Sequence, residues 1–384
     1  MPKSAYIFIA LFLALLVALF CTPQRDETGG RVVIHYWTGW TGHELDVQRK
    51  LVARFNREHP RIEVKILSVA NSYQKVKISF AGGSTPDVVS AVWADELAGY
   101  AFRGVLTPLD DLMKETGYDP DDIMPGVRRM LTIDSGMYGL CATTNSSFIA
   151  YNKDIFRQSG LDPERPPETI EQLDLAAEKT TLRDRNGNYI RYGLRPGSLV
   201  WWGYVFGGKW YDERTGRITA NDPKNVEALR WIVSYAKKYD ISKMESFEQT
   251  FGSIQTVNGP FFVGKTAMWP TGEWAEEHIK RYAPKLHWGW FAAPAPPGGR
   301  TNTCVVGGSV FVIPAACTHR KEAWEFLSYI CGHDPVKEFC LSIGNIPPLK
   351  SVAAEPEFQN NPLFRFAITL ASGENAFGPP PVPI

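Results

Sequence analysis

The stretch that most constrains the fold covers residues 81–100, AGGSTPDVVSAVWADELAGY. Its paired glycines can end a helix, because glycine adopts the left-handed conformation without strain, and Pro86 then forces an extended chain. The apolar run VVSAV is typical of a strand buried on both faces. Ligands of open α/β sheets bind beyond the carboxyl ends of the strands. We therefore predict a core strand that presents three side chains to a cleft: Trp93, Asp95 and Glu96. The alternative is a core position for Trp93, followed by a surface helix.

The flanking segments alternate between strand and helix patterns. Residues 32–37 and 62–66 are predicted strands, and residues 43–58 and 73–81 are predicted helices. This β-α-β-α-β order predicts an α/β protein with a parallel sheet and right-handed crossovers. A chain of 384 residues is long enough for two lobes around one cleft.

Residues 1–21 are predicted to be a targeting segment. One basic residue precedes the apolar run 5–20, which is short for a membrane span of about 20 residues and resembles a signal peptide. Cys21 follows directly and suggests lipoprotein processing, although Phe20 departs from the small residue that normally precedes such a cysteine. An uncleaved anchor is the alternative. Either places the mature chain outside the cytoplasm, with residues 22–30 as a tether.

Composition excludes several classes of function. The 41 basic residues balance the 41 acidic ones, so no basic patch favours nucleic acid. The five cysteines after Cys21 form no C-x-x-C pair, and no histidine lies at metal-ligand spacing, which argues against a zinc site. Their odd number leaves at least one free thiol, and the pairing cannot be deduced. No cofactor or metal is indicated. Twelve tryptophans exceed what a core needs, and exposed aromatic platforms are one use for the surplus.

Two glycine-containing segments suggest ligand contacts. VWWGYVFGGKW, residues 200–210, can be a buried helix, but its three glycines weaken a helix. Because the adjacent Trp201 and Trp202 cannot both face one core, we predict that at least one lines a cleft. Gly307, paired with another glycine inside the predicted strand 303–313, marks a bulge, a crossover or a ligand seat.

Several segments, in this order and spacing, carry a resemblance to a known family: YWTGW, AGGSTPDVVSAVWADELAGYAFRGVLTPLDD, GMYGLCATTNSSFIAYNKDIFRQSGL, FVGKTAMWPTGEW, GGSVFVIP, EAWEFLSYI and GNIPP. They resemble an extracytoplasmic sugar-binding protein of an ABC importer, of the maltodextrin-binding kind, within solute-binding protein family 1. The resemblance covers roughly residues 31–354.

The resemblance implies the type II periplasmic-binding-protein fold, with two lobes that are each a mostly parallel sheet flanked by helices. Lobe 1 is expected at 31–138 plus 308–340, and lobe 2 at 139–307 plus 341–384. Crossover hinge strands are implied near residues 136–141, 303–308 and 339–344. The family usually continues beyond such a proline-rich end into a further helix, so lobe 2 is expected to lack its last helix.

The resemblance also implies binding residues. Trp93, Asp95 and Glu96 correspond to first-lobe sugar contacts, and Trp274 corresponds to a stacking platform on the second lobe. Trp40 and Glu44 fall in the contact region after the first strand, whereas Asp87 of the Pro-Asp pair can equally be structural. Position alone adds five candidates: Asn145, Trp201, Trp202, Trp269 and Gly307.

A sugar ring has C–H faces that tryptophan covers and a rim of hydroxyls that carboxylates and amides bind. We therefore expect a monomeric receptor that closes around a sugar and delivers it to the transmembrane subunits of an ABC permease. A glycosidase using Asp95 and Glu96, or Glu273, is the main alternative, but adjacent residues diverge too far for carboxyl groups that must lie about 5–9 Å apart across a substrate. A sensor for a membrane kinase, and a polyol or glycerol phosphate ester as ligand, also remain open.

Overall fold

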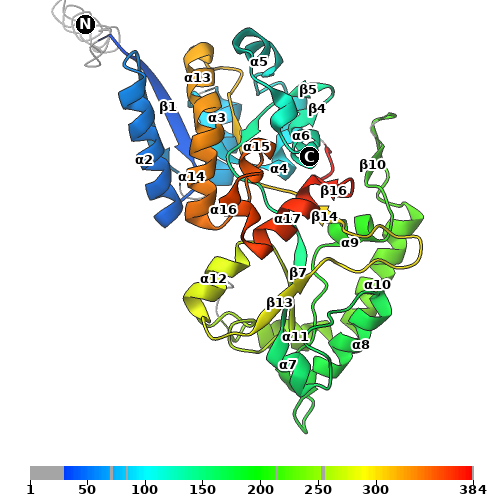
Figure 1. The fold of residues 1–384 in the computed structure, drawn as a ribbon. Coiled ribbons are helices and arrows are strands. Elements are labelled where there is room, and N and C mark those ends of the chain that lie inside the picture. The colour runs from blue at the N-terminus through cyan, green and yellow to red at the C-terminus, as the bar shows by residue number, and fades with distance from the viewer. Residues whose placement is uncertain (1–29, 70–71, 84, 213, 252–255, 383–384) are drawn as a thin grey trace, which may run out of the picture.

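The computed structural model describes residues 30–69, 72–83, 85–212, 214–251 and 256–382. The predicted leader, with Cys21, lies outside the described residues. Two lobes lie one above the other in Figure 1, with the red C-terminal helices between them. In the described part of the chain, no helix combines the length and apolar character needed to cross a membrane.

A five-stranded sheet forms the centre of the first lobe, in the order β2-β1-β3-β15-β6. β1 pairs in parallel with β2 and β3, as the β-α-β-α-β pattern predicts, whereas β15 runs antiparallel to β3 and β6. This mixed sheet confirms the α/β class. The strands are β1 (Val32–Thr38), β2 (Ile62–Ser68), β3 (Val88–Trp93), β6 (Leu140–Cys141) and β15 (Ser309–Val312).

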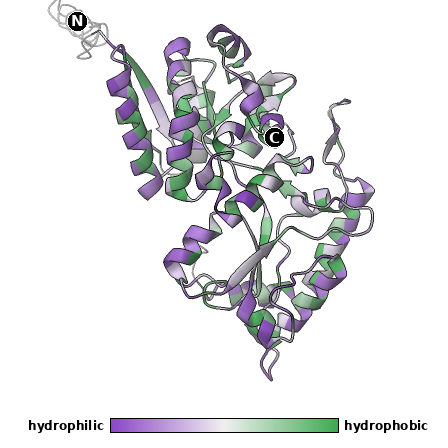
Figure 2. Ribbon diagram, viewed as in Figure 1, coloured by the Kyte–Doolittle hydropathy of each residue, from purple (hydrophilic) through white to green (hydrophobic). Residues whose placement is uncertain are grey.

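Helices cover both faces of this sheet. α2 packs with α13 and α14 on one face, whereas α3 contacts β3, and α4 contacts β3 and β15 (Figure 1). α2 forms because Leu45, Val52 and Phe55 recur on one face and are buried there, and it ends just before Pro60. In Figure 2 the helices turn hydrophilic residues outward. Their bounds are α2 (Gly42–Glu58), α3 (Ser72–Gly82), α4 (Ala94–Phe102), α13 (Arg320–Ile330) and α14 (His333–Ile343).

The second lobe is built on a three-stranded sheet in the order β12-β7-β13. Both outer strands run antiparallel to β7, which corrects the expectation of a mostly parallel sheet in this lobe. β12 and β13 are nevertheless parallel to each other, because α12 carries the chain across β7. The strands are β7 (Phe148–Asn152), β12 (Met268–Thr271) and β13 (Trp288–Phe291); the helices are α7 (Lys153–Gln158), α8 (Ile170–Thr180), α9 (Leu199–Val205), α10 (Pro223–Tyr239), α11 (Ile241–Glu248) and α12 (Ala275–Tyr282).

Short elements complete the described chain. The strands are β4 (Thr132–Ile133), β5 (Gly136–Met137), β8 (Leu182–Arg183), β9 (Tyr189–Arg191), β10 (Tyr211–Asp212), β11 (Arg217–Ile218), β14 (Cys304–Val305) and β16 (Ala376–Phe377). The helices are α5 (Asp110–Thr116), α6 (Pro125–Leu131), α15 (Lys350–Ala353), α16 (Pro356–Gln359) and α17 (Pro362–Ser372), with a 3₁₀ turn at Pro120–Asp122. All five described cysteines are buried free thiols.

The lobes meet where the chain passes from β6 to β7 and returns from β13 to β15. Thr144 ties these passages together, because its N–H donates to Ile346 O at 3.0 Å and its hydroxyl donates to Gly307 O at 2.9 Å. The hydroxyl of Ser147 donates to Val305 O at 3.1 Å. We call these segments the hinge region: residues 144–147, 305–308 and 346.

The C-terminal segment departs from the expected division. α14 continues to Ile343, so no crossover strand forms at residues 339–344. The buried side chains of Val352, Phe358 and Leu363 then belong to the same core cluster as the first sheet, rather than to the second lobe. α17 has an apolar face, which is stable only when it is buried. This face packs against α6 and β14, so the C-terminal segment joins the core of the first lobe.

Candidate functional site

A cavity of about 720 Å³ lies between the lobes, at the carboxyl ends of β1 and β3. We call it the interlobe cavity. Its volume lies within the roughly 300–1,000 Å³ of small-molecule sites. The first lobe contributes the segment 39–44, which includes the start of α2, together with Ser90, Trp93, Ser309 and the end of α14. The second lobe contributes four side chains from two successive turns of α12: Glu277, His278, Arg281 and Tyr282.

The interlobe cavity brings together three of the residues predicted from sequence. Trp93, at the end of β3, is 39% exposed, so it is a surface aromatic and not a core one. Trp40 is half-buried edge-on against Phe339, with ring centroids 5.8 Å apart. Its buried indole N–H finds no hydrogen-bond partner among the described residues. Glu44 lines the same wall. Their role in binding stays a prediction.

The second-lobe wall holds polar residues that sequence reasoning missed. Burial lowers the pKa of His278 below its ordinary value, and Arg281 adds to this effect. The imidazole is therefore neutral at pH 7, and its buried Nδ1 has no partner among the described residues. A neutral imidazole both donates and accepts, which suits a hydroxyl. The spacing of His278 and Tyr282, four residues apart in a helix directly after TGEW, was the available signal.

The two acids after Trp93 have different surroundings. Asp95 is exposed in the first turn of α4. Glu96 forms an ion pair with Lys77 of α3 at 3.1 Å. Burial raises the pKa of Glu96, and Lys77 opposes the rise. Neither residue lines the interlobe cavity, so their place among the ligand contacts is corrected.

Asp87 lies at the opposite end of β3 from Trp93. Its carboxylate accepts the His35 N–H at 2.9 Å, and the Cys317 thiol donates to it at 3.3 Å. A residue just before a strand sits at the amino edge of the sheet, away from the cavity. Asp87 is therefore structural, and its place among the ligand contacts is corrected.

The tryptophan pair is also corrected. Residues 199–205 form α9, in which Trp201 is 3% exposed and Trp202 is fully buried. Their indole N–H groups donate to Thr303 O at 3.0 Å and Pro196 O at 2.7 Å. Both rings can be buried because α9 is covered on more than one side. Gly203 allows a third indole ring to pack against α9, because a Cβ at this position would collide with the ring of Trp210.

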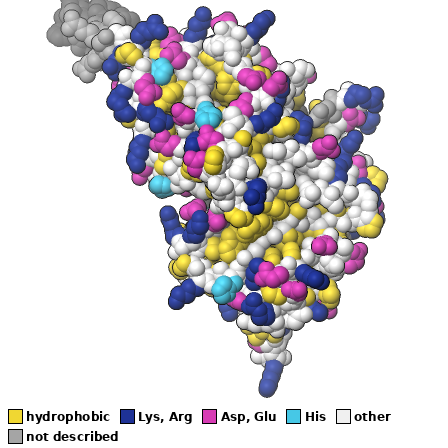
Figure 3. All heavy atoms as spheres, in the orientation of Figure 1, with side chains coloured by type: hydrophobic (Ala, Val, Ile, Leu, Met, Phe, Trp, Pro, Cys, Tyr) yellow, Lys and Arg dark blue, Asp and Glu magenta, His cyan; other side chains and the backbone are white. Residues whose placement is uncertain are grey.

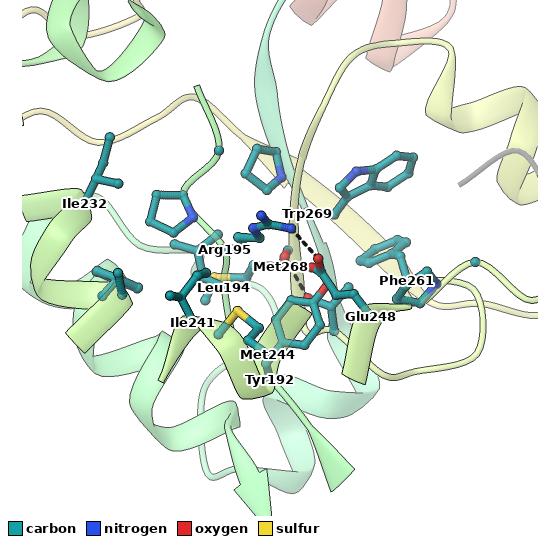
Figure 4. Close-up of a pocket in the computed structure, with 18 of the residues that line it drawn as sticks. Tyr192, Leu194, Arg195, Ile232, Ile241, Met244, Glu248, Phe261, Met268 and Trp269 are labelled. Carbon is teal, nitrogen blue, oxygen red and sulfur yellow. Dashed lines mark hydrogen bonds and ion pairs between the residues drawn. The ribbon is translucent and has the colours of Figure 1, made fainter. Parts of the chain in front are cut away.

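A second cavity, also of about 720 Å³, lies within the second lobe and contains Trp269 (Figure 4). We call it the second-lobe cavity. Trp269 packs against Phe261 at 5.5 Å between ring centroids. Arg195 forms ion pairs with Glu248 and with Glu245, the latter at 3.0 Å. Sequence reasoning missed Phe261 and the ion pairs of Arg195, because segments far apart in the chain bring these residues together.

The remaining candidates lie at or beside the hinge region. Asn145 is half-buried, and its amide faces Gly307, where an added Cβ would approach Asn145 Oδ1 to 3.1 Å. The half-buried Trp274 ring lies against Gly272, which only glycine allows. None of these residues lines either cavity. Among the described residues, no three His, Cys, Asp or Glu side chains group as a metal site.

Comparisons with known proteins agree with this architecture. The family model described as bacterial extracellular solute-binding protein matches residues 44–336. An uncharacterized ABC transporter extracellular-binding protein of Pyrococcus horikoshii is 28% identical over 350 residues, covering 87% of this chain and 75% of its own. The maltotriose-binding protein of Pyrococcus abyssi is 24% identical over 353 residues, covering 89% and 72%. The structure of CpMnBP1 with mannobiose bound has a TM-score of 0.79 at 28% identity, covering 91% of this chain and 90% of that one.

Proposed function

The chain belongs to the bacterial extracellular solute-binding protein family, and from this premise we propose that it binds an oligosaccharide between its lobes for an ABC importer. The observation that carries the proposal is the interlobe cavity, because both lobes line it. Mannobiose and maltotriose, the sugars in the names of similar proteins, support a carbohydrate ligand.

The lining of the interlobe cavity suits a sugar. The exposed face of Trp93 can cover the C–H face of a pyranose ring. Around it, Glu44, Arg281 and the neutral His278 can bind hydroxyls as acceptor, donor or both. Trp269 and Arg195, which line the second-lobe cavity, can contact additional sugar units of a longer saccharide. Asn145, Gly307 and Trp274 line neither cavity, and we propose that they reach the ligand from the hinge side only when the lobes close.

Lobe closure follows from this division of contacts. A ligand that touches Trp93 on one lobe and His278 on the other stabilises the arrangement in which both can be reached. We propose that residues 31–138 with 308–340 move against residues 139–307, around the hinge region. The closed form then docks, as a monomer, on the transmembrane subunits of the permease. The rival assignment of a glycosidase lacks support from Asp95 and Glu96, because neither lines the interlobe cavity.

The family is extracellular. Attachment to a membrane through an acylated Cys21, after removal of residues 1–20, is part of the proposal. Mass spectrometry of the mature N-terminus tests it, because diacylglycerol adds a defined mass to Cys21, whereas a simple signal-peptide cleavage leaves no lipid.

The proposed ligand class is tested by thermal unfolding and intrinsic tryptophan fluorescence of the chain from Thr22. Mannobiose, mannotriose and maltotriose are the first saccharides, with glycerol 3-phosphate and sorbitol as comparisons. A saccharide at 100 times its Kd should stabilise the fold by about 2.7 kcal/mol and raise the melting temperature. Cooperative unfolding that no saccharide shifts, or consumption of the sugar by the protein, would contradict the proposal.

A further inference from the structure

A fully buried carboxyl group lies at the junction of the lobes. Glu273 follows β12 and precedes α12, and its side chain has no exposure to solvent. Its Oε2 accepts the backbone N–H of Ser146 at 3.0 Å. Ser146 belongs to the hinge region, so this hydrogen bond joins the second-lobe loop to the passage between the lobes.

The polar groups around Glu273 are incompletely satisfied. Oε1 of Glu273 and the hydroxyl of Thr271 are buried without a hydrogen-bond partner among the described residues. A buried polar atom without a partner destabilises the arrangement that holds it. Such a cluster at a hinge therefore makes the relative position of the lobes sensitive to the state of this one carboxyl group.

We propose that Glu273 is a positioning residue for ligand binding, which fixes the loop carrying Trp274 to the hinge at Ser146 and makes ligand affinity depend on whether its carboxyl group is protonated. The inference rests on the proposed function. It adds a proton-linked element that none of the cavity-lining residues supplies.

The surroundings of Glu273 favour its neutral form. Burial raises the pKa of Glu273 to about 8, and the backbone N–H groups of Ser146, Glu273 and Ile346, with the Ser146 hydroxyl, offset only part of the rise. The other titratable groups facing it are the thiols of Cys304 on β14 and Cys340 on α14. Burial raises the pKa of both thiols, that of Cys304 to about 12, so neither ionises below pH 9. Burial lowers the pKa of His278, so this imidazole stays neutral between pH 7 and pH 9.

The first test needs no ligand. Glu273→Gln keeps the size and an acceptor for Ser146 but cannot ionise. Because the folded protein holds its proton up to about pH 8, whereas an unfolded glutamate loses it near 4.5, the free energy of unfolding of the wild type falls as pH rises through this interval. The melting temperature of wild type relative to Glu273→Gln should therefore fall from pH 5 to 8 and level off above. A difference that does not change with pH overturns the inference.

The matched control is Glu178→Gln. In the wild type, Glu178 forms an exposed ion pair with Lys238 on the surface of the second lobe. It should shift the melting temperature by a nearly constant small amount across the same pH range. A control that reproduces the pH trend of Glu273→Gln would show that any lost carboxylate has this effect, and would also overturn the inference.

The second test uses mannobiose and maltotriose in calorimetric titrations at pH 7 and pH 9. Wild type should bind more weakly at pH 9, whereas Glu273→Gln should keep one affinity at both. Glu273→Ala, which removes the tie to Ser146, should weaken binding about tenfold or more at either pH. If Glu273 had a structural role alone, the affinities of wild type and Glu273→Gln would change with pH in the same way.

The two proposals fail separately. If wild type binds neither saccharide at either pH, the proposed ligand class is wrong, while the ligand-free pH trend still decides the state of Glu273. If wild type binds and Glu273→Ala binds equally well, or if wild type and Glu273→Gln weaken alike at pH 9, the positioning role is wrong and the receptor function stands.

Discussion

At the scale of single residues, burial separates tryptophans that the sequence cannot distinguish. Trp93 ends a strand and keeps 39% of its surface exposed beside the interlobe cavity. Trp202 is fully buried and donates its indole N–H to Pro196 O. Only the first can lie against a ligand without disturbing the core, so their substitutions should have different consequences.

Trp93→Ala should weaken saccharide binding by about 1–3 kcal/mol, because it removes the proposed stacking surface. It should leave the melting temperature of the free protein nearly unchanged. Trp202→Ala, the matched control, should lower the free energy of unfolding by about 3–5 kcal/mol through a core cavity. Calorimetric titration and denaturant unfolding measure the two effects. Equal affinity of Trp93→Ala and wild type would remove Trp93 from the site.

The cysteines lead to a second prediction at this scale. Burial raises the pKa of the Cys141 and Cys317 thiols to about 12. Because the thiolate is the reactive form, iodoacetamide at pH 8 should not modify the folded protein at its five described cysteines. Unfolding in guanidinium should expose all five. Rapid labelling of a native cysteine, located by mass spectrometry, would show a local opening at that site.

At the scale of elements, α9 shows why glycines inside a helical pattern need not break it. A Cβ at Gly203 would collide with the Trp210 ring and approach Asn225 Oδ1 to 2.7 Å. The glycines of this segment therefore allow close packing against α10 and its neighbours. The propensity argument against a helix was correct in direction, but tertiary packing outweighs the roughly 1 kcal/mol involved.

Gly203→Ala should accordingly destabilise the protein by about 1–3 kcal/mol through overpacking. Gly82→Ala is the matched control, because nothing lies within 4 Å of a Cβ there and the backbone is not left-handed. It should be neutral, or stabilising by roughly 0.5–1 kcal/mol as helix propensity improves. Urea unfolding measures both. A tolerated Gly203→Ala would mean that the Trp210 ring moves aside freely.

At the scale of the whole molecule, the two lobes differ in kind. The first has a mixed five-stranded sheet with helices on both faces, and the second has a small antiparallel sheet with its helices around it (Figure 1). Apolar side chains gather across the middle of the face in Figure 3, along β13. The hydrogen bonds of the hinge region join the two passages between the lobes, and the proposed closure would bend the chain about them.

Ligand binding should therefore make the molecule more compact. Small-angle X-ray scattering of the chain from Thr22, with and without a saturating saccharide, should show a fall in the radius of gyration, because contacts to both lobes stabilise the closed form. The control is sucrose at a concentration that gives the same solvent density, after calorimetric titration has shown that it does not bind. Saturable binding with an unchanged radius would mean that the ligand engages one lobe alone.

Local patterns in the sequence were not sufficient for the antiparallel β15 and β6, but they were sufficient for the three parallel strands β1, β2 and β3, the helices between them and the position of Trp93 at the end of β3. Those features depend on residues close together in the chain: apolar alternation, helical spacing, and the glycines and proline that end elements. Tertiary structure decided that Trp201 and Trp202 are core, that Asp87 is structural, that the C-terminal helices join the first lobe, and that α12 supplies His278 to the cavity. These depend on which distant segments cover each side chain, and burial by a distant segment leaves no mark on local sequence.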